Sequence, residues 1–257
     1  MNKINLSIII PSINPERLIN IYDQCKNTLD SKYTFELIYV GPIIPSLELI
    51  QKENFKFYID YGSPARSFQI GSLFAEGVYL AFLPDDGIIQ NNAFTECLDL
   101  AYRISEIDGI TLRYSEGVNY TGDQSDNLEY WRGKYHDDQK LDGVSSEWKI
   151  APLFMMHTLY FRELGGLDCM FEHVNLNSHD LMYRLQKIGG TMHLSPSKVL
   201  AADWNKNYAQ SILFQAYTQN DLPLFQKLYN NYDPNRLKID YLNWINSPAK
   251  WQRRYNN

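Results

Sequence analysis

The chain has 257 residues, of which 44% are hydrophobic and 14% aromatic, and it carries a formal net charge of −6. This length suffices for one large α/β domain, or for a domain of about 200 residues with a helical appendage, but it is short for two independent domains. The negative charge argues against nucleic acid as the main partner, because phosphate backbones are bound through a surplus of Lys and Arg. A small phosphate-bearing ligand is not excluded.

The cysteines and the N-terminal segment bear on the cellular compartment in which the protein is expected. Cys25, Cys97 and Cys169 are widely separated, without the CxxC spacing of a zinc site or the even number of a disulfide framework. The apolar run at residues 6–10 is followed at once by Pro11 and is too short for a signal peptide or a membrane span. We therefore expect a cytoplasmic protein.

The first half of the chain alternates short apolar segments with helical ones, which is the pattern of a parallel sheet covered by helices. Strands are expected at residues 6–10, 35–40, 56–59, 79–83 and 109–114. Helices are expected between them, at residues 15–29, 46–53, 67–75 and 93–104.

The second half is less regular. Residues 115–148 are polar and too long for an ordinary connection, which indicates a functional loop. A strand is expected at 153–161, a turn at 164–168, and a helix at 180–188 that ends at Gly189 and Gly190. Beyond residue 203 the chain is rich in aromatic residues and is expected to be helical.

Two acidic residues, Asp85 and Asp86, directly follow the strand predicted at 79–83. Ligands of open α/β sheets bind beyond the carboxyl ends of the strands, and magnesium or manganese prefers such hard oxygen ligands. The sequence Pro-Asp-Asp-Gly is also ordinary β-turn chemistry, so the pair alone does not decide between a turn and a metal site.

The order of several segments resembles the family 2 glycosyltransferases of GT-A fold. The segments that carry the resemblance are residues 7–12, 35–40, 65–67 and 79–86, followed by 164–168 and then His179-Asp180-Leu181 to Arg184 and Gly189. The resemblance spans roughly residues 4–200 and implies a Rossmann-like, mixed but mostly parallel sheet flanked by helices. It implies a GT-A domain at 1–202, with a donor-binding half at about 1–114 and an acceptor half at about 115–202, and a helical extension at 203–257 packed on it.

The resemblance also implies roles for donor-binding residues. Pro11, Ser12 and Asn14 are expected to line the nucleoside pocket, and Asp60 to lie near the base or the ribose. Arg66 is expected to approach the diphosphate, to which a guanidinium gives bidentate hydrogen bonds, although an exposed arginine at a helix start is an equally ordinary interpretation.

The implied metal is Mn²⁺ or Mg²⁺. Asp86 matches the metal-binding carboxylate of the family's DxD-type motif, and Asp85 matches the neighbouring acid that faces the ribose or sugar. Asp203 stands where relatives often present a histidine to the metal, and its carboxylate suits the same ion.

An inverting transfer needs a general base for the acceptor hydroxyl, and Asp180 is the candidate, with Glu172 in reserve. The chain departs from the family here, because Asn177 and Ser178 replace the usual acid pair, and Asp180 could instead cap the helix predicted to start there. Gly41-Pro42 stands where many relatives carry a pair of aspartates, one of which reads a uracil ring. A UDP-sugar remains the favoured donor, and the sugar and acceptor stay open.

The resemblance predicts a metal-dependent, inverting glycosyltransferase that acts in surface polysaccharide or glycoconjugate assembly on a glycan or lipid-linked acceptor. The alternatives are a catalytically inactive binding module of the same fold and a nucleotidyltransferase, although residues 12–15 lack the glycine-rich basic loop of the latter class. The C-terminal residues Trp251, Arg253 and Arg254 are expected to pack on the domain, with peripheral contact at the inner face of the membrane as the other possibility.

Overall fold

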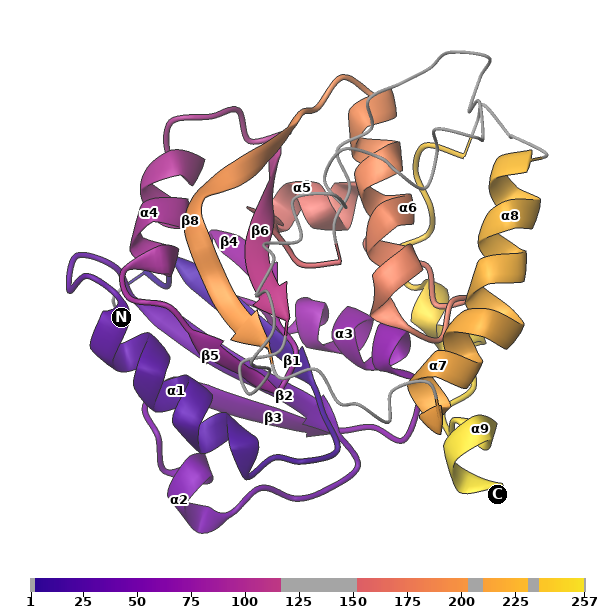
Figure 1. The fold of residues 1–257 in the computed structure, drawn as a ribbon, viewed down its shortest axis with the longest axis horizontal. Coiled ribbons are helices and arrows are strands. Elements are labelled where there is room, and N and C mark those ends of the chain that lie inside the picture. The colour runs from indigo at the N-terminus through magenta and orange to yellow at the C-terminus, as the bar shows by residue number, and fades with distance from the viewer. Residues whose placement is uncertain (1–2, 117–151, 203–209, 231–235, 257) are drawn as a thin grey trace.

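The computed structural model describes residues 3–116, 152–202, 210–230 and 236–256 (Figure 1). The candidate metal ligand Asp203 therefore lies outside the described residues. So does the predicted functional loop at 115–148, except for its first two residues. The elements of the first half are β1 (Leu6–Pro11), α1 (Arg17–Thr28), β2 (Phe35–Gly41), α2 (Leu47–Ile50), β3 (Phe55–Ile59), α3 (Pro64–Leu73), β4 (Tyr79–Phe82), β5 (Gly87–Ile89), α4 (Ala93–Ala101) and β6 (Gly109–Glu116).

The elements of the second half begin with β7 (Phe154–His157), α5 (Thr158–Glu163), α6 (Val174–Lys187) and β8 (Met192–Ala202). The C-terminal extension then contains α7 (Ile212–Ala216), the π-helix η4 (Tyr217–Asp221), α8 (Leu222–Asn230), the 3₁₀-helix η5 (Asn243–Asn246) and α9 (Gln252–Tyr255).

The strands of the described residues form one eight-stranded sheet in the order β3-β2-β1-β4-β7-β6-β8-β5. The β3, β2, β1 and β4 strands run parallel, as do β6 and β8, whereas β7 is antiparallel to both of its neighbours. The carboxyl ends of the four parallel strands thus meet at one edge of the sheet. The predicted α/β class with a mixed, mostly parallel sheet is confirmed.

Alternation along the strands divides the core between the two faces of the sheet. Leu6, Ile8 and Ile10 of β1 pack with the apolar faces of α1 and α4, whereas Ile9 packs on the opposite side with α3, α5 and α6. Figure 1 shows these helices on the two sides of the sheet. Both faces of β1 are therefore buried, which explains its continuous apolar sequence.

Two expected elements differ from the structure, and two observed strands have no counterpart among the predictions. The run predicted as a strand at 153–161 is β7 followed by α5, since an apolar run of this length does not distinguish a strand from a buried helix. The strands β5 and β8 were not expected; β8 contains Pro196 and makes shifted pairings with β6, so it has no regular alternation. The helix predicted at 180–188 begins at Val174, because the side chain of His173 accepts a hydrogen bond from the Asn175 N–H (2.9 Å).

The C-terminal extension contacts two separate parts of the molecule. Its α8 packs Phe225 and Tyr229 against Tyr183 of α6. Residues 236–256 then return to the edge of the sheet, where the Trp251 N–H donates to the Tyr61 carbonyl (2.8 Å) directly after β3. Figure 1 shows this return as the yellow segment that ends in α9. Among the described residues no helix has the length and apolar character needed to cross a bilayer.

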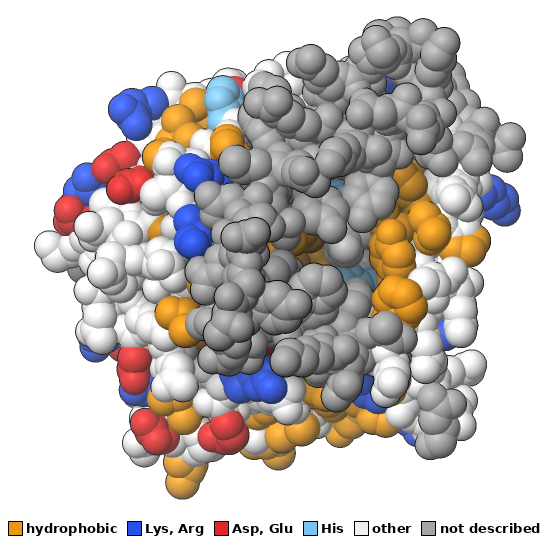
Figure 2. Space-filling model, in the orientation of Figure 1, with side chains coloured by type: hydrophobic (Ala, Val, Ile, Leu, Met, Phe, Trp, Pro, Cys, Tyr) orange, Lys and Arg blue, Asp and Glu red, His pale blue; other side chains and the backbone are white. Residues whose placement is uncertain are grey.

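Charged groups are dispersed on the surface. Figure 2 shows the face of Figure 1 in space-filling form, with acidic and basic side chains interspersed along its left and lower rim. The described part of this face has no large surface of one sign. A charged ligand would therefore have to be recognised there by a few local side chains rather than by a general field.

Candidate active site

The carboxyl edge of the parallel strands brings Ser12 and Asp85 together. The Ser12 hydroxyl, directly after β1, donates a hydrogen bond to Asp85 Oδ2 and accepts one from the Asn14 N–H (2.8 Å). Pro84 lies between β4 and Asp85, and β5 starts two residues later at Gly87. The Pro-Asp-Asp-Gly sequence is therefore a turn between two strands and, at the same time, holds an acid at the edge where ligands of such sheets bind.

Asp85 interacts with basic side chains. Arg17 at the start of α1 lies 3.7 Å from Asp85 Oδ1, and 18% of the Asp85 side chain is exposed. Burial lowers the pKa of Arg254 on α9, while the neighbouring Tyr255 and Asp85 act in the opposite direction. Asp86, the residue that follows Asp85, is also partly buried. The edge thus combines two carboxylates with the guanidinium group of Arg17, a mixture that suits a phosphate ligand with its counterion.

Asp60 and Arg66 form a second, buried group. Asp60 Oδ1 accepts from Arg66 Nε (3.1 Å), and Asp60 Oδ2 accepts from the Gly62 N–H (2.9 Å). One terminal nitrogen of Arg66 donates to the carbonyls of Trp244 and Ser247, in the C-terminal extension. Both predicted donor-binding residues are thus brought together, and in this structure they hold the extension against the N-terminus of α3.

Gly41, directly after Val40 in β2, has no room for a side chain. A Cβ atom at this position would lie 1.9 Å from the backbone oxygen of Ser12 and 2.6 Å from the hydroxyl of Tyr39. Burial raises the pKa of Tyr39 to about 12, and its hydroxyl donates to the Ile43 carbonyl (2.9 Å). No side chain fits at position 41, so recognition of a base here depends on other groups.

The predicted base Asp180 lies in the middle of α6 and is fully buried. Its Oδ2 accepts from Arg184 Nε (2.9 Å), and its Oδ1 accepts from the Tyr229 hydroxyl (2.5 Å). Arg184 is also fully buried and donates to the carbonyls of Leu164 (2.7 Å) and Gly166 (2.5 Å). The expectation that Asp180 caps a helix start is wrong. Its surroundings instead tie α6 to α8 and to the turn before it.

Glu172, the reserve candidate, has different surroundings. Its side chain is 25% exposed, its Oε2 accepts from Arg253 Nε (2.7 Å), and it borders a cavity. Its backbone carbonyl accepts from the Ala65 N–H in the first turn of α3 (3.2 Å). Glu172 therefore lies beside the Asp60 and Arg66 group and remains accessible, whereas Asp180 does not.

The residues at the edge fit a hard divalent ion. No group of three or more His, Cys, Asp or Glu side chains converges in the described part of the chain. Mg²⁺ and Mn²⁺ commonly bind through one or two carboxylates and take their other ligands from water and substrate phosphates. Asp85 and Asp86 are such a pair, since both are only partly buried and both follow β4.

Residues of α9 lie beside the candidate site, and no sequence pattern assigns them to it. Arg253 contacts Glu172, and the guanidinium of Arg254 lies over the ring of Trp251 at 4.9 Å. Only 4% of Trp251 is exposed. The basic and aromatic character of this tail was visible in the sequence, but it was equally typical of a membrane-facing segment. Only the pairing of residue 250 with Tyr61 places it at the sheet edge.

Comparison with known proteins identifies the fold. No protein-family model and no curated protein matches the sequence. Among solved structures, the glycosyltransferase TarS of S. aureus (residues 1–349) is similar with a TM-score of 0.57 at 15% identity, over 91% of this chain and 71% of that one. GalNAc-T7 with UDP, GalNAc and Mn²⁺ is similar with a TM-score of 0.58 at 14% identity, over 96% of this chain and 57% of that one.

The chain has the GT-A fold. It spans 41% of a longer TarS structure, which it matches with a TM-score of 0.61. The TarS fragment has also been solved in complex with UDP and with UDP-GlcNAc. At these identities the similarity establishes the architecture and leaves the activity to be argued from the site.

Proposed function

We propose that the protein is an inverting, metal-dependent glycosyltransferase that uses a nucleotide diphosphate sugar. The observation that supports this most is the position of Asp85, Asp86 and Ser12 at the carboxyl edge of β1 and β4 in a GT-A fold. This is the edge at which open α/β sheets bind nucleotides. Ser12, Asn14 and the backbone at Pro11 would line the nucleoside.

A divalent ion bound by Asp85 and Asp86 would neutralise charge on the diphosphate, and Asp203 is a further proposed ligand. Arg17 lies beside Asp85 and would contact the phosphates, together with Arg254, whose charge interacts with that of Asp85. Arg66 is bonded to buried partners. UDP is the proposed nucleotide, because structures of TarS and GalNAc-T7 with the same fold contain UDP.

In the proposed reaction an acceptor hydroxyl oxygen forms a bond to the anomeric carbon of the donor sugar. The bond from that carbon to the diphosphate oxygen breaks, and the electron pair leaves with the nucleoside diphosphate. The hydroxyl proton passes to a carboxylate, for which we assign Glu172 rather than Asp180, since Glu172 is accessible and both oxygens of Asp180 are occupied.

The acceptor is proposed to be a glycan or lipid-linked saccharide of a surface polysaccharide or glycoconjugate, and the site of action the cytoplasm or the inner face of the membrane. The C-terminal tail gives limited support to membrane contact, because Trp251 is buried and Arg253 is paired within the fold.

A panel of nucleotide sugars tests the proposal. The protein is incubated with UDP-, GDP-, dTDP- and CMP-sugars, with Mn²⁺, with Mg²⁺ and with EDTA, and release of the free nucleotide is measured. We expect release of UDP from one UDP-sugar, dependent on the metal. If no nucleotide sugar binds or is cleaved with either metal, the proposed activity is wrong.

A second candidate function is a binding module that holds a nucleotide sugar without transferring it. The observation that favours it is the replacement of the family's acid pair by Asn177 and Ser178, both fully buried. Asn177 Oδ1 accepts from the Asp168 N–H (2.9 Å), so it has a structural role. Such a module would show metal-dependent nucleotide binding in calorimetry without any release of the sugar, whereas an enzyme shows both.

A further inference from the structure

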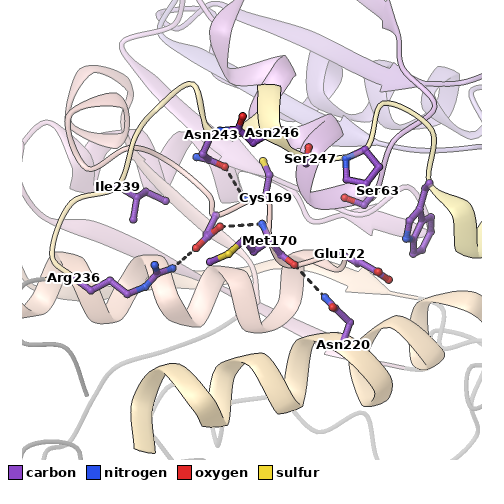
Figure 3. Close-up of a pocket in the computed structure, with 13 residues that line it drawn as sticks. Ser63, Cys169, Met170, Glu172, Asn220, Arg236, Ile239, Asn243, Asn246 and Ser247 are labelled. Carbon is purple, nitrogen blue, oxygen red and sulfur yellow. Dashed lines mark hydrogen bonds and ion pairs between the residues drawn. The ribbon is translucent and has the colours of Figure 1, made fainter. Parts of the chain in front are cut away.

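A cavity of about 580 Å³ lies between the segment that precedes α6 and the C-terminal extension (Figure 3). Its walls include Glu172 before α6, Asn220 of η4, Asn246 of η5 and Trp251 at the start of α9. Figure 3 shows the labelled side chains on opposite sides of this space, with Arg236 and Ile239 facing it from the side away from Glu172. Its volume is in the range of small-molecule sites.

The lining is polar but electrically balanced. Of its carboxylates, Asp168 is paired with Arg236, and Glu172 is paired with Arg253 at 2.7 Å. A phosphate ligand would meet the carboxylates of Asp168 and Glu172, and a cation would meet the guanidinium of Arg236. Each paired carboxylate still carries lone pairs able to accept a hydroxyl hydrogen bond. The charge arrangement therefore favours a neutral ligand with many hydroxyl groups.

The cavity also offers groups that suit the two sides of a sugar ring. Trp251 is 4% exposed, and its indole N–H has no hydrogen-bond partner among the described residues. Asn246 is exposed at the rim, and Met170 and Ile239 add apolar surface. The ring of Trp251 is covered by Arg254, so Trp251 offers its indole N–H rather than a ring face. Amide, indole and carboxylate groups bind the hydroxyls of a saccharide, and the apolar side chains contact its C–H bonds.

The cavity adjoins the donor edge through α9. Arg253 donates a hydrogen bond to Glu172 in the cavity wall, and the charge of the next residue, Arg254, interacts with that of Asp85. Arg66 is joined to Ser247, which also lines the cavity. The α9 segment therefore joins this space to the edge proposed to hold the donor diphosphate, and Glu172 lines the space.

We infer that this cavity is the acceptor subsite and that it binds a neutral saccharide through Trp251, Asn246 and Glu172. The inference rests on the proposed glycosyltransferase function and adds the acceptor class and the place where it binds. The C-terminal extension would then complete the acceptor site, because two of the three residues belong to it.

The test uses the full chain and methyl glycosides of common hexoses and N-acetylhexosamines as probes. Binding is measured by saturation-transfer NMR, and the ratio of transfer to donor hydrolysis is measured with the UDP-sugar that the panel selects. We expect at least one glycoside to bind, and Asn246→Leu and Trp251→Phe to lower both its affinity and the ratio at least tenfold. Gln252→Ala is the matched control, because Gln252 is exposed on α9 and does not line the cavity.

Two results would overturn the inference. The first is a glycoside that binds both cavity variants as tightly as it binds the wild-type protein. The second is a wild-type protein that cleaves the donor but binds no glycoside. Either result would place the acceptor elsewhere. Failure of the proposed function looks different, since the wild-type protein would then neither bind nor cleave any nucleotide sugar. Asn246→Leu replaces an exposed side chain, so this arm does not depend on the folding of Trp251→Phe.

Discussion

Two groups of acidic residues were both predicted as active-site carboxylates, but they differ in position, burial and hydrogen bonding. Asp85 and Asp86 lie at a sheet edge and are partly buried, with the Ser12 hydroxyl and Arg17 beside Asp85. Asp180 lies inside a helix, fully buried, with both oxygens bonded to Arg184 and Tyr229. The first arrangement leaves room for a ligand to replace existing contacts. The second is complete without one, which indicates a role in stability.

The largest expected effect comes from Asp180→Ala. Removing this carboxylate leaves the buried Arg184 without its ionic partner, which typically costs about 3 to 5 kcal/mol of unfolding free energy. Urea denaturation measures the change, with Asp23→Ala as control, since Asp23 is half exposed and paired with a surface lysine. A stable Asp180→Ala variant that has lost transfer would instead make Asp180 the base.

Asp86→Ala should affect catalysis more than stability. Loss of a ligand that supports charge neutralisation on the leaving diphosphate is expected to lower the transfer rate at least about 100-fold. Initial rates at saturating donor and metal measure this, with Asp23→Ala again as the control for loss of a carboxylate. Rates equal to wild type in Asp86→Ala would show that the metal lies elsewhere.

A pH-dependent effect is expected at His173, the N-cap of α6. Burial lowers the pKa of His173 to about 4, and its neutral Nδ1 accepts the Asn175 N–H. A depressed pKa means that the unfolded chain takes up the proton first, so stability is lost as the pH falls from about 6.5 towards 4, by about 2 kcal/mol.

The variant His173→Asn retains a capping oxygen and removes the titration. Its unfolding free energy should therefore approach or exceed that of wild type as the pH falls from 6.5 to 4. Subtraction of the two profiles also cancels Asp221, whose pKa burial raises to about 6 and which acts in the opposite direction. A constant difference between the two proteins across this range would exclude the titration of His173.

The smallest effect is expected at Arg17. Its side chain is 54% exposed and 3.7 Å from Asp85, and such exposed pairs contribute little. Arg17→Ala should change the unfolding free energy by less than about 0.5 kcal/mol in thermal or chemical denaturation. A loss above about 2 kcal/mol would mean that the donor edge is as tightly bonded as the Asp180 cluster.

The first half of the chain could be predicted well because its strands are apolar runs separated by clear breakers. Pro84 and the two acids after β4 indicated the carboxyl edge of the parallel strands from the sequence alone. The helix start near Asp180 could not be found in the same way. The residue that caps α6 is His173, and capping by a histidine nitrogen has no strong sequence pattern.

The contribution of the C-terminal extension depended on contacts between residues far apart in the sequence. Arg66 bonds to residues 244 and 247, and Tyr61 pairs with residue 250. Local patterns such as periodicity and turn residues carry no information about such pairs. For the same reason the accessible position of Glu172 and the cavity beside it could be seen only in the folded chain.

The most direct test of the central claim is calorimetric titration of UDP into the wild-type protein and into Asp86→Ala, with and without Mn²⁺. The account predicts binding to the wild-type protein that requires the metal, and at least a tenfold weaker affinity in the variant. UDP binding that is equally strong in Asp86→Ala, or the absence of binding of UDP and every other nucleoside diphosphate to the wild-type protein, would contradict it.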